Sequence, residues 1–247
     1  MSVRPDAPAT PLASGESPSF KGRLRGAAHI LFEPLVGTLD RLGIGPDHVT
    51  VMGLLVSVIA TLAFFEGYFP IGAMLVALSG VCDILDGELA RRAGRRSRFG
   101  AFLDSTLDRL SDGLVLTGIA GFYMVHLYEL VMDPSQAVAE ISRGLEPRTW
   151  AVVSLTAVLA MVGSFMVSYT RARAEGLGLE CKVGWVERPE RMVLLIVAAS
   201  FGVGRIMSLA LILLALLSFA TAAQRVVHVW KHTRGAGLDD LNRDGPR

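Results

Sequence analysis

The chain has 247 residues, of which 51% are hydrophobic, and its net formal charge is +1 with a mean hydropathy of +0.47. This hydrophobicity exceeds what a soluble domain of this size needs, and the near-neutral charge gives no basic field for nucleic acid. The two cysteines, Cys82 and Cys181, lack CxxC spacing, so we expect buried thiols and neither a disulfide nor a zinc site.

The N-terminal region divides into two segments. Residues 1–19 are rich in Pro, Ala and Ser without an apolar run, which predicts a disordered tail and not a signal peptide. Residues 20–45 begin with basic residues and then place apolar residues near helical spacing. This pattern predicts an amphipathic helix lying in the membrane interface. The residues that set the pattern are Lys21, Arg23, Arg25, Leu31, Phe32, Leu35, Leu39 and Leu42.

Six apolar segments follow, and each is long enough, or nearly so, to cross the hydrocarbon core of a membrane. They cover approximately 48–66, 70–92, 98–127, 150–172, 189–204 and 206–230, the fifth being short. The predicted fold class is therefore all-α, a polytopic integral membrane protein with six transmembrane helices. These helices form one domain over residues 46–231, and a cytoplasmic tail follows over 232–247.

Basic residues in the loops predict the orientation of the chain. They concentrate between the second and third spans, between the fourth and fifth spans, and after the sixth. The loop near Glu66 has no Lys or Arg, and the loop over 128–149 has mixed charges. Both termini should therefore lie on the cytoplasmic side. The basic residues are Arg91, Arg92, Arg95, Arg96, Arg98, Arg171, Arg173, Lys182, Arg188, Lys231 and Arg234.

Four aspartates lie inside these apolar segments. Asp83 and Asp86 are three residues apart, and Asp104 and Asp108 are four apart, so each pair shares one face of a helix. Both pairs should lie about 9–14 Å below the cytoplasmic ends of their spans. Facing carboxylates repel strongly in a low dielectric, so cations must accompany them, and hard oxygen ligands favour Mg²⁺ or Mn²⁺. We predict a metal site, because intramembrane carboxylates are costly and usually functional.

The spacing D-x2-D-G-x2-A-R-x8-G-x3-D-x3-D resembles the signature of the CDP-alcohol phosphotransferases, integral membrane enzymes that make phospholipid head groups. It is met by Asp83, Asp86, Gly87, Ala90, Arg91, Gly100, Asp104 and Asp108. The resemblance implies a CDP-linked lipid donor, CDP-diacylglycerol. A hydroxyl of the acceptor would attack the lipid-proximal phosphorus and expel CMP.

The same resemblance implies roles for individual carboxylates. Asp83, Asp86 and Asp104 would hold one Mg²⁺, with Asp83 and Asp104 shared with a second ion, and Mn²⁺ could replace Mg²⁺. Asp108 would be the general base that takes the acceptor proton and is counted among the metal ligands. Asp112 continues the Asp104 and Asp108 stripe by one turn, and we interpret it as supporting the site or pairing with an Arg.

Other residues would bind the CDP-lipid. Gly87 would let the nucleotide approach the helix backbone, and Arg91 would hold the pyrophosphate. Ser97 matches a hydroxyl near the nucleotide, with a loop cap as the alternative. The first span begins with an element that resembles the nucleotide-contacting P-[ND]-x-x-T of the family, although Asp47 alone could be a helix N-cap. That element is Asp47, His48, Val49 and Thr50.

Three arginines indicate the acceptor. Arg171, Arg191 and Arg225 should all lie at cytoplasmic depth, and Arg suits phosphate oxygens, although Arg171 in particular could be an ordinary interfacial anchor. The stretches Y-x-x-A-R-A-E, E-R-P-E-R and Q-R resemble bacterial phosphatidylinositol phosphate synthases of the actinobacterial type. That resemblance implies inositol phosphate as the acceptor, with Arg171 standing where relatives commonly have Lys.

Two alternatives remain open from the sequence. Glycerol 3-phosphate also carries a phosphate, so a phosphatidylglycerophosphate synthase would use the same arginines. A divalent-cation transporter could also place carboxylates in the membrane, but all four aspartates lie near one side, and transport needs neither Gly87 nor Arg91. The expected partners are CDP-diacylglycerol, a phosphorylated polyol, membrane lipid and, as the family implies, a second copy in a homodimer.

Overall fold

The computed structural model describes residues 32–92, 97–133, 135, 138, 141 and 147–234. The predicted tail over 1–19 lies outside these residues, as does the tail predicted over 232–247 except for 232–234, of which 232–233 still belong to the last helix. The described part contains helices and no strand, so the all-α prediction is confirmed. Residues 32–41 are helical. The other helices are α2 (Pro46–Phe65), α3 (Phe69–Arg92), α4 (Arg98–Met132), α6 (Pro147–Glu175), α7 (Arg188–Ser200) and α8 (Arg205–Thr233).

Five of these helices, α2, α3, α4, α6 and α8, are long and apolar enough to cross a membrane. Helix α7 has 13 residues, about 20 Å at 1.5 Å per residue, which is less than the roughly 30 Å of a hydrocarbon core. The predicted span over 189–204 is therefore shorter than expected, because the helix ends at Ser200. The count of six spans stays a prediction.

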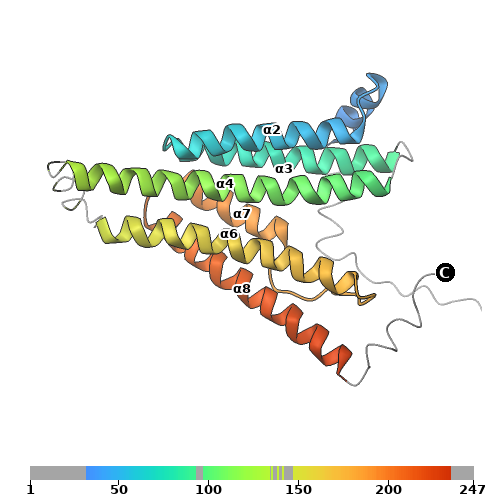
Figure 1. Ribbon diagram of the computed structural model, residues 1–247. Helices are drawn as coiled ribbons and strands as arrows, with labels where there is room; N and C mark the ends of the chain where they lie inside the picture. The colour runs from blue at the N-terminus through green and yellow to red at the C-terminus, as the bar shows by residue number, and fades with distance from the viewer. Residues whose placement is uncertain are drawn as a thin grey trace, which may run out of the picture.

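The helices form two groups that pack on one another (Figure 1). Helices α2, α3 and α4 lie side by side, and α6, α7 and α8 pack against them through the pairs α4–α6 and α3–α7. The starts of α2 and α4 and the ends of α3 and α6 lie at the right of Figure 1. Residues far apart in sequence are thereby brought to one end of the bundle.

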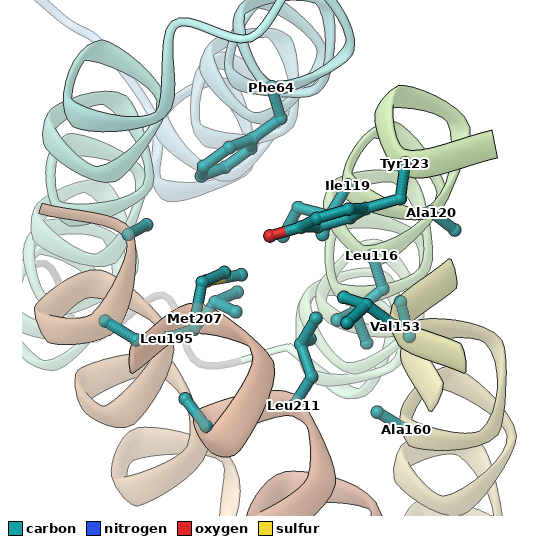
Figure 2. Close-up of a cluster of buried hydrophobic side chains, with 14 of the residues drawn as sticks. Phe64, Leu116, Ile119, Ala120, Tyr123, Val153, Ala160, Leu195, Met207 and Leu211 are labelled. Atoms are coloured by element: carbon teal, nitrogen blue, oxygen red, sulfur yellow. The ribbon is translucent and has the colours of Figure 1, made fainter. Parts of the chain in front are cut away.

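A continuous apolar core joins all six helices. Figure 2 shows Phe64, Tyr123, Met207 and Leu211 of this core, which come from α2, α4 and α8 and point into the space between the helices. The outer faces of the long helices instead leave large apolar side chains such as Leu62 exposed, as contact with lipid requires. The core and the apolar surface together indicate a rigid bundle in a membrane.

A smaller apolar cluster attaches the first helix to the bundle. Val36 is buried against Val49 of α2 and Leu85 and Leu89 of α3. Of the segment 20–45 that the sequence predicts to be one helix, the structure shows helix over 32–41, and residues 20–31 lie outside the described residues. Its place in the membrane interface stays a prediction. Cys82 and Cys181 are both buried free thiols, as expected.

Helices α2 and α4 come close enough at one point that only glycine fits. A Cβ atom on Gly118 would lie 2.5 Å from the backbone oxygen of Thr61, a distance that real Cβ atoms do not tolerate. Because the obstacle is backbone, a larger residue must push the two helices apart. This contact fixes the distance between the helix that carries Thr50 and the helix that carries Asp104 and Asp108.

We therefore expect Gly118→Ala to destabilise the protein by about 1–3 kcal/mol, the usual cost of overpacking. Thermal unfolding in detergent would measure it. Gly80→Ala in α3 is the matched control, since a Cβ there meets no atom within 4 Å. Equal melting temperatures for the two variants would contradict the close contact.

Candidate functional site

The structure brings the four predicted aspartates together where α3 ends and α4 begins. Asp86 interacts electrostatically with Asp83 and Asp104, and Asp108 interacts with Asp83, Asp104 and Asp112. We call Asp83, Asp86, Asp104 and Asp108 the aspartate cluster. Its members come from two antiparallel helices whose ends the bundle places side by side.

The start of α2 supports this cluster through Thr50. Its buried hydroxyl donates a hydrogen bond of 2.7 Å to Oδ2 of Asp86. Val49 is fully buried in the smaller apolar cluster, so its side chain faces the interior and cannot reach a nucleotide from there. Asp47 is not the N-cap of α2, because Gly45 holds that position. His48 is exposed at the same end.

The start of α4 lies beside Asp47. The Ser97 hydroxyl accepts a hydrogen bond of 2.8 Å from the backbone N–H of Gly100, so Ser97 is the N-cap of α4 and the cap interpretation is confirmed. A Cβ on Gly100 would lie 3.2 Å from Oδ1 of Asp47. The absence of a side chain at Gly100 therefore lets the two helix starts meet.

Arg91 currently covers the backbone of Gly87. Its guanidinium lies 3.5 Å from where a Cβ of Gly87 would be, and its Nη2 contacts Oε1 of Glu88 at 2.5 Å. The Arg91 side chain is half exposed, so it can move without disturbing the core. Gly87 and Arg91, two of the residues predicted to bind the CDP-lipid, thus lie next to each other near the end of α3.

From the sequence, Arg188 is expected only to help set the orientation of the chain, yet it contacts three carboxylates. Its Nη1 contacts Oδ2 of Asp83 and lies 2.9 Å from Oδ1 of Asp108, and its Nε lies 3.3 Å from Oδ1 of Asp112. Arg188 and Arg191 are three residues apart in α7, so they share a face. Their spacing in the sequence was therefore the signal that could have placed Arg188 beside Arg191 at the site.

The first turn of α7 is fixed locally, which sets the direction of these two arginines. The Glu190 carboxylate accepts a hydrogen bond of 3.1 Å from the backbone N–H of Glu187, the capping residue. Pro189 stands in the first turn, where its missing N–H costs nothing. The Arg188 backbone is therefore held in place while its side chain reaches the aspartates.

The contacts of Arg188 occupy two of the carboxylates that were predicted to bind metal. Within the described residues, no three His, Cys, Asp or Glu side chains converge as the ligands of a metal ion do. Asp83 and Asp108 both face the Arg188 guanidinium in this structure, and the metal site formed by the four aspartates stays a prediction. The donor set itself suits a hard divalent cation, since it consists of four carboxylates on two neighbouring helices.

A cavity of about 100 Å³ adjoins the cluster, and we call it the arginine-lined cavity. Five arginines line it against three acidic residues, so it favours an anion. Its lining is Asp108, Arg109, Asp112, Val167, Ser168, Arg171, Glu187, Arg188, Arg191 and Arg225. The three arginines expected to bind the acceptor therefore face one space, and Asp108 of the aspartate cluster faces it too.

The three predicted arginines are held differently. Arg171 is partly exposed and pairs with Glu175 at 2.8 Å. Arg191 is only 5% exposed; its Nη2 lies 3.3 Å from Asp112, and its Nε has no hydrogen-bond partner. Arg225 is 2% exposed. Interfacial anchoring is therefore wrong for Arg191 and Arg225, and the predicted pairing of Asp112 with an Arg is confirmed.

Arg225 also fixes the loop between α6 and α7. Its Nε donates to the carbonyl of Val183 at 2.9 Å and its Nη1 to that of Val167 at 2.5 Å. Gly184 has a φ of 143°, and a Cβ there would lie 2.6 Å from the Thr221 methyl group. The loop therefore packs tightly on α8, and its last residue, Glu187, lines the arginine-lined cavity.

Fold and site together define a polytopic helical membrane protein with carboxylates beside an arginine-lined cavity. The family model of the CDP-alcohol phosphatidyltransferases matches residues 44–231. The chain belongs to this family.

Curated relatives cover most of the chain. It is 38% identical to the archaetidylinositol phosphate synthase of Methanothermobacter thermautotrophicus over 198 residues, 79% of this chain and 88% of the relative. It is 35% identical to the phosphatidylinositol phosphate synthase of Streptomyces avermitilis, over 82% of this chain and 79% of the relative.

Solved structures agree. The crystal structure of Mycobacterium tuberculosis phosphatidylinositol phosphate synthase with CDP-DAG bound superposes with a TM-score of 0.66 at 33% identity, over 80% of this chain and 92% of that one. The complex of the same enzyme with manganese and citrate gives a TM-score of 0.65 at 33% identity, over 80% and 88%. The likeness thus includes the fold and most of the described helices.

Proposed function

We propose that the protein transfers the phosphatidyl group of CDP-diacylglycerol to inositol phosphate, giving phosphatidylinositol phosphate and CMP. The observation that carries the proposal is that Asp108 belongs both to the aspartate cluster and to the arginine-lined cavity. The curated relatives support the acceptor, because the names of the two described above share inositol phosphate and differ in the lipid.

The aspartate cluster is where the donor pyrophosphate would bind. Asp83, Asp86 and Asp104 would hold one Mg²⁺ or Mn²⁺, and Asp108 would join Asp83 and Asp104 around a second. Such ions neutralise the negative charge that builds up on phosphate oxygens during transfer. A solved relative in complex with manganese supports a divalent cation. Thr50 would keep the Asp86 carboxylate in its orientation through their hydrogen bond.

The nucleotide part of the donor would lie along the ends of α3 and α4. Arg91 would leave Glu88 and bind the pyrophosphate, which exposes the backbone at Gly87. Asp47, His48 and Ser97 line the same end of the bundle, where the starts of α2 and α4 meet. Val49 would contribute only through its backbone, because its side chain is buried.

The chemical step follows from the position of Asp108. The acceptor phosphate would bind Arg171, Arg191 and Arg225, so that a ring hydroxyl of the acceptor faces Asp108. The hydroxyl oxygen forms a bond to the lipid-proximal phosphorus, the bond from that phosphorus to the CMP oxygen breaks, and the hydroxyl proton moves to Asp108. The arginines supply positioning, which accounts for much of the catalysis in phosphoryl transfer.

Two further properties belong to the same proposal. The site and both termini of the chain would lie on the cytoplasmic side, as the arginine-rich loops indicate. The protein would form a homodimer, as the family resemblance implies. The divalent-cation transporter is not supported, since the chain belongs to an enzyme family.

Purified protein with CDP-diacylglycerol tests the proposal. It should form a lipid product and CMP with inositol phosphate, and not with inositol, glycerol 3-phosphate or serine. Mg²⁺ or Mn²⁺ should be required, and a chelator should abolish turnover. A preference for glycerol 3-phosphate would mean that the acceptor is glycerol 3-phosphate and not inositol phosphate. Full activity in metal-free buffer would contradict the metal site.

Asp108→Asn should lower kcat by about 10²–10⁴, the usual value of a general base, because Asn keeps the volume but accepts no proton. Binding of CDP-diacylglycerol should change little, which serves as the internal control for folding. Turnover within about tenfold of the parent would mean that another group takes the proton.

Arg191→Gln should raise the KM for inositol phosphate by roughly 10- to 150-fold, as the loss of a charge-assisted phosphate contact does. Arg171→Gln should raise it less, because Arg171 is partly exposed. The KM for CDP-diacylglycerol should stay the same in both. Arg173→Gln is the matched control, since Arg173 lies on α6 like Arg171 but is exposed and does not line the cavity. If all three variants keep the parental KM for the acceptor, the arginines bind no phosphate.

A further inference from the structure

We infer that Arg188 is the internal counter-cation of the aspartate cluster and that a divalent cation must displace it. Once displaced, its guanidinium turns into the arginine-lined cavity and completes the site for the acceptor phosphate. This inference rests on the proposed function and adds a positioning residue that couples the metal site to the acceptor site.

The first step is the competition for oxygen atoms. One nitrogen of Arg188, Nη1, contacts both Asp83 and Asp108, two of the four carboxylates proposed to hold metal. A guanidinium and a divalent cation cannot both lie against the same carboxylate oxygens, because they overlap in space and repel each other. Metal binding to this pair therefore requires that Arg188 leaves.

The second step is the reason for Arg188 to be there at all. Neighbouring carboxylates that are mostly buried repel strongly unless a cation neutralises them. Arg188 contacts three carboxylates with one side chain, Asp83, Asp108 and Asp112, and is itself mostly buried. It can therefore stabilise the cluster when no metal is bound.

The third step is the destination of the side chain. Arg188 already forms part of the wall of the arginine-lined cavity, and its Nε is 3.3 Å from Asp112. The Asp112 carboxylate is itself held by Arg191, at 3.3 Å. The Nε of Arg188 can therefore keep its contact with Asp112 while the Nη1 of Arg188 turns away from Asp83 and Asp108. The α7 backbone need not move, because Glu190 and Pro189 fix its first turn.

The move has an electrostatic consequence. Arg188 would approach Arg171, Arg191 and Arg225, and their mutual repulsion opposes it until an anion enters the cavity. Phosphate should therefore favour metal binding, and metal should favour phosphate binding to the same extent, because such coupling is reciprocal. The enzyme would assemble a complete acceptor site only when its metal is bound.

Mn²⁺ binding to the purified protein without lipid substrate tests this, with free Mn²⁺ followed by electron paramagnetic resonance. Arg188→Gln removes the competing charge and should bind Mn²⁺ about tenfold more tightly than the parent, or better. Inorganic phosphate should tighten Mn²⁺ binding by about fivefold or more in the parent and by less than about twofold in the variant. Phosphate bound only to the metal would give the same increase in both proteins and would overturn the inference.

Arg109→Gln is the matched control. Arg109 lines the same cavity, but its Nη1 is 3.8 Å from Asp108. The substitution therefore removes an equal positive charge without freeing the carboxylates of the aspartate cluster. We expect less than about a threefold change in Mn²⁺ affinity, since such a loose pair contributes little.

Arg188→Lys keeps the charge but cannot contact three carboxylates at once, so it should fold even if Arg188→Gln does not, and it should bind Mn²⁺ with intermediate affinity. Parental or weaker Mn²⁺ affinity in whichever Arg188 variants fold would overturn the inference. A parent protein that binds no Mn²⁺ would instead overturn the metal site of the proposed function.

Discussion

Repulsion among closely spaced carboxylates is the constraint on which the rest of this structure depends. Asp83, Asp86, Asp104 and Asp108 lie in helices that are otherwise apolar, where water screens charge poorly. Each neighbouring polar contact relieves part of that cost. Thr50 donates to Asp86, and Arg188 bridges Asp83 and Asp108. An enzyme that binds a pyrophosphate through metal ions needs this stored negative charge, and the fold must contain it between turnovers.

The same charges organise the second half of the site. Asp112 continues the stripe into the bundle and holds both Arg188 and Arg191, so the acidic end of α4 positions the basic start of α7. Arg225 extends the arrangement by hydrogen bonds to backbone carbonyls of α6 and of the following loop. The aspartate cluster and the arginine-lined cavity are therefore two sides of one charge network, and Asp108 belongs to both.

A rigid frame keeps this network in register. The apolar core, part of which Figure 2 shows, joins all six helices. Gly118 lets α2 and α4 touch at the backbone of Thr61. At the loop before α7, Gly184 permits a comparably close approach to Thr221. Small residues at helix contacts are the usual means of close packing in a membrane, where the hydrophobic effect does not drive helices together. Positioning of substrates in phosphoryl transfer depends on such rigidity.

Local periodicity and hydropathy in the sequence alone predict the helices of this protein and the helix faces on which its aspartates lie. The helices begin and end within a few residues of the apolar segments, because hydropathy and the 3.6-residue period are properties of neighbouring residues. The same period placed Asp83 with Asp86 and Asp104 with Asp108 before any packing was known. Interfacial charge distribution then indicated that Arg171, Arg191 and Arg225 belong to one end.

Only the tertiary structure decided which of these groups touch. Arg188 meets Asp83 across 105 residues of chain, and no local pattern encodes a contact over that separation. The same holds for Val49, which turns into an apolar cluster and away from the site, and for Arg225, whose donors face backbone carbonyls. The end of helix α7 at Ser200 is instead a local effect, because Gly202 just beyond it has a φ of 78°, the left-handed conformation that commonly ends a helix. Spacing along a helix selects a face, and the packing of six helices determines what that face meets.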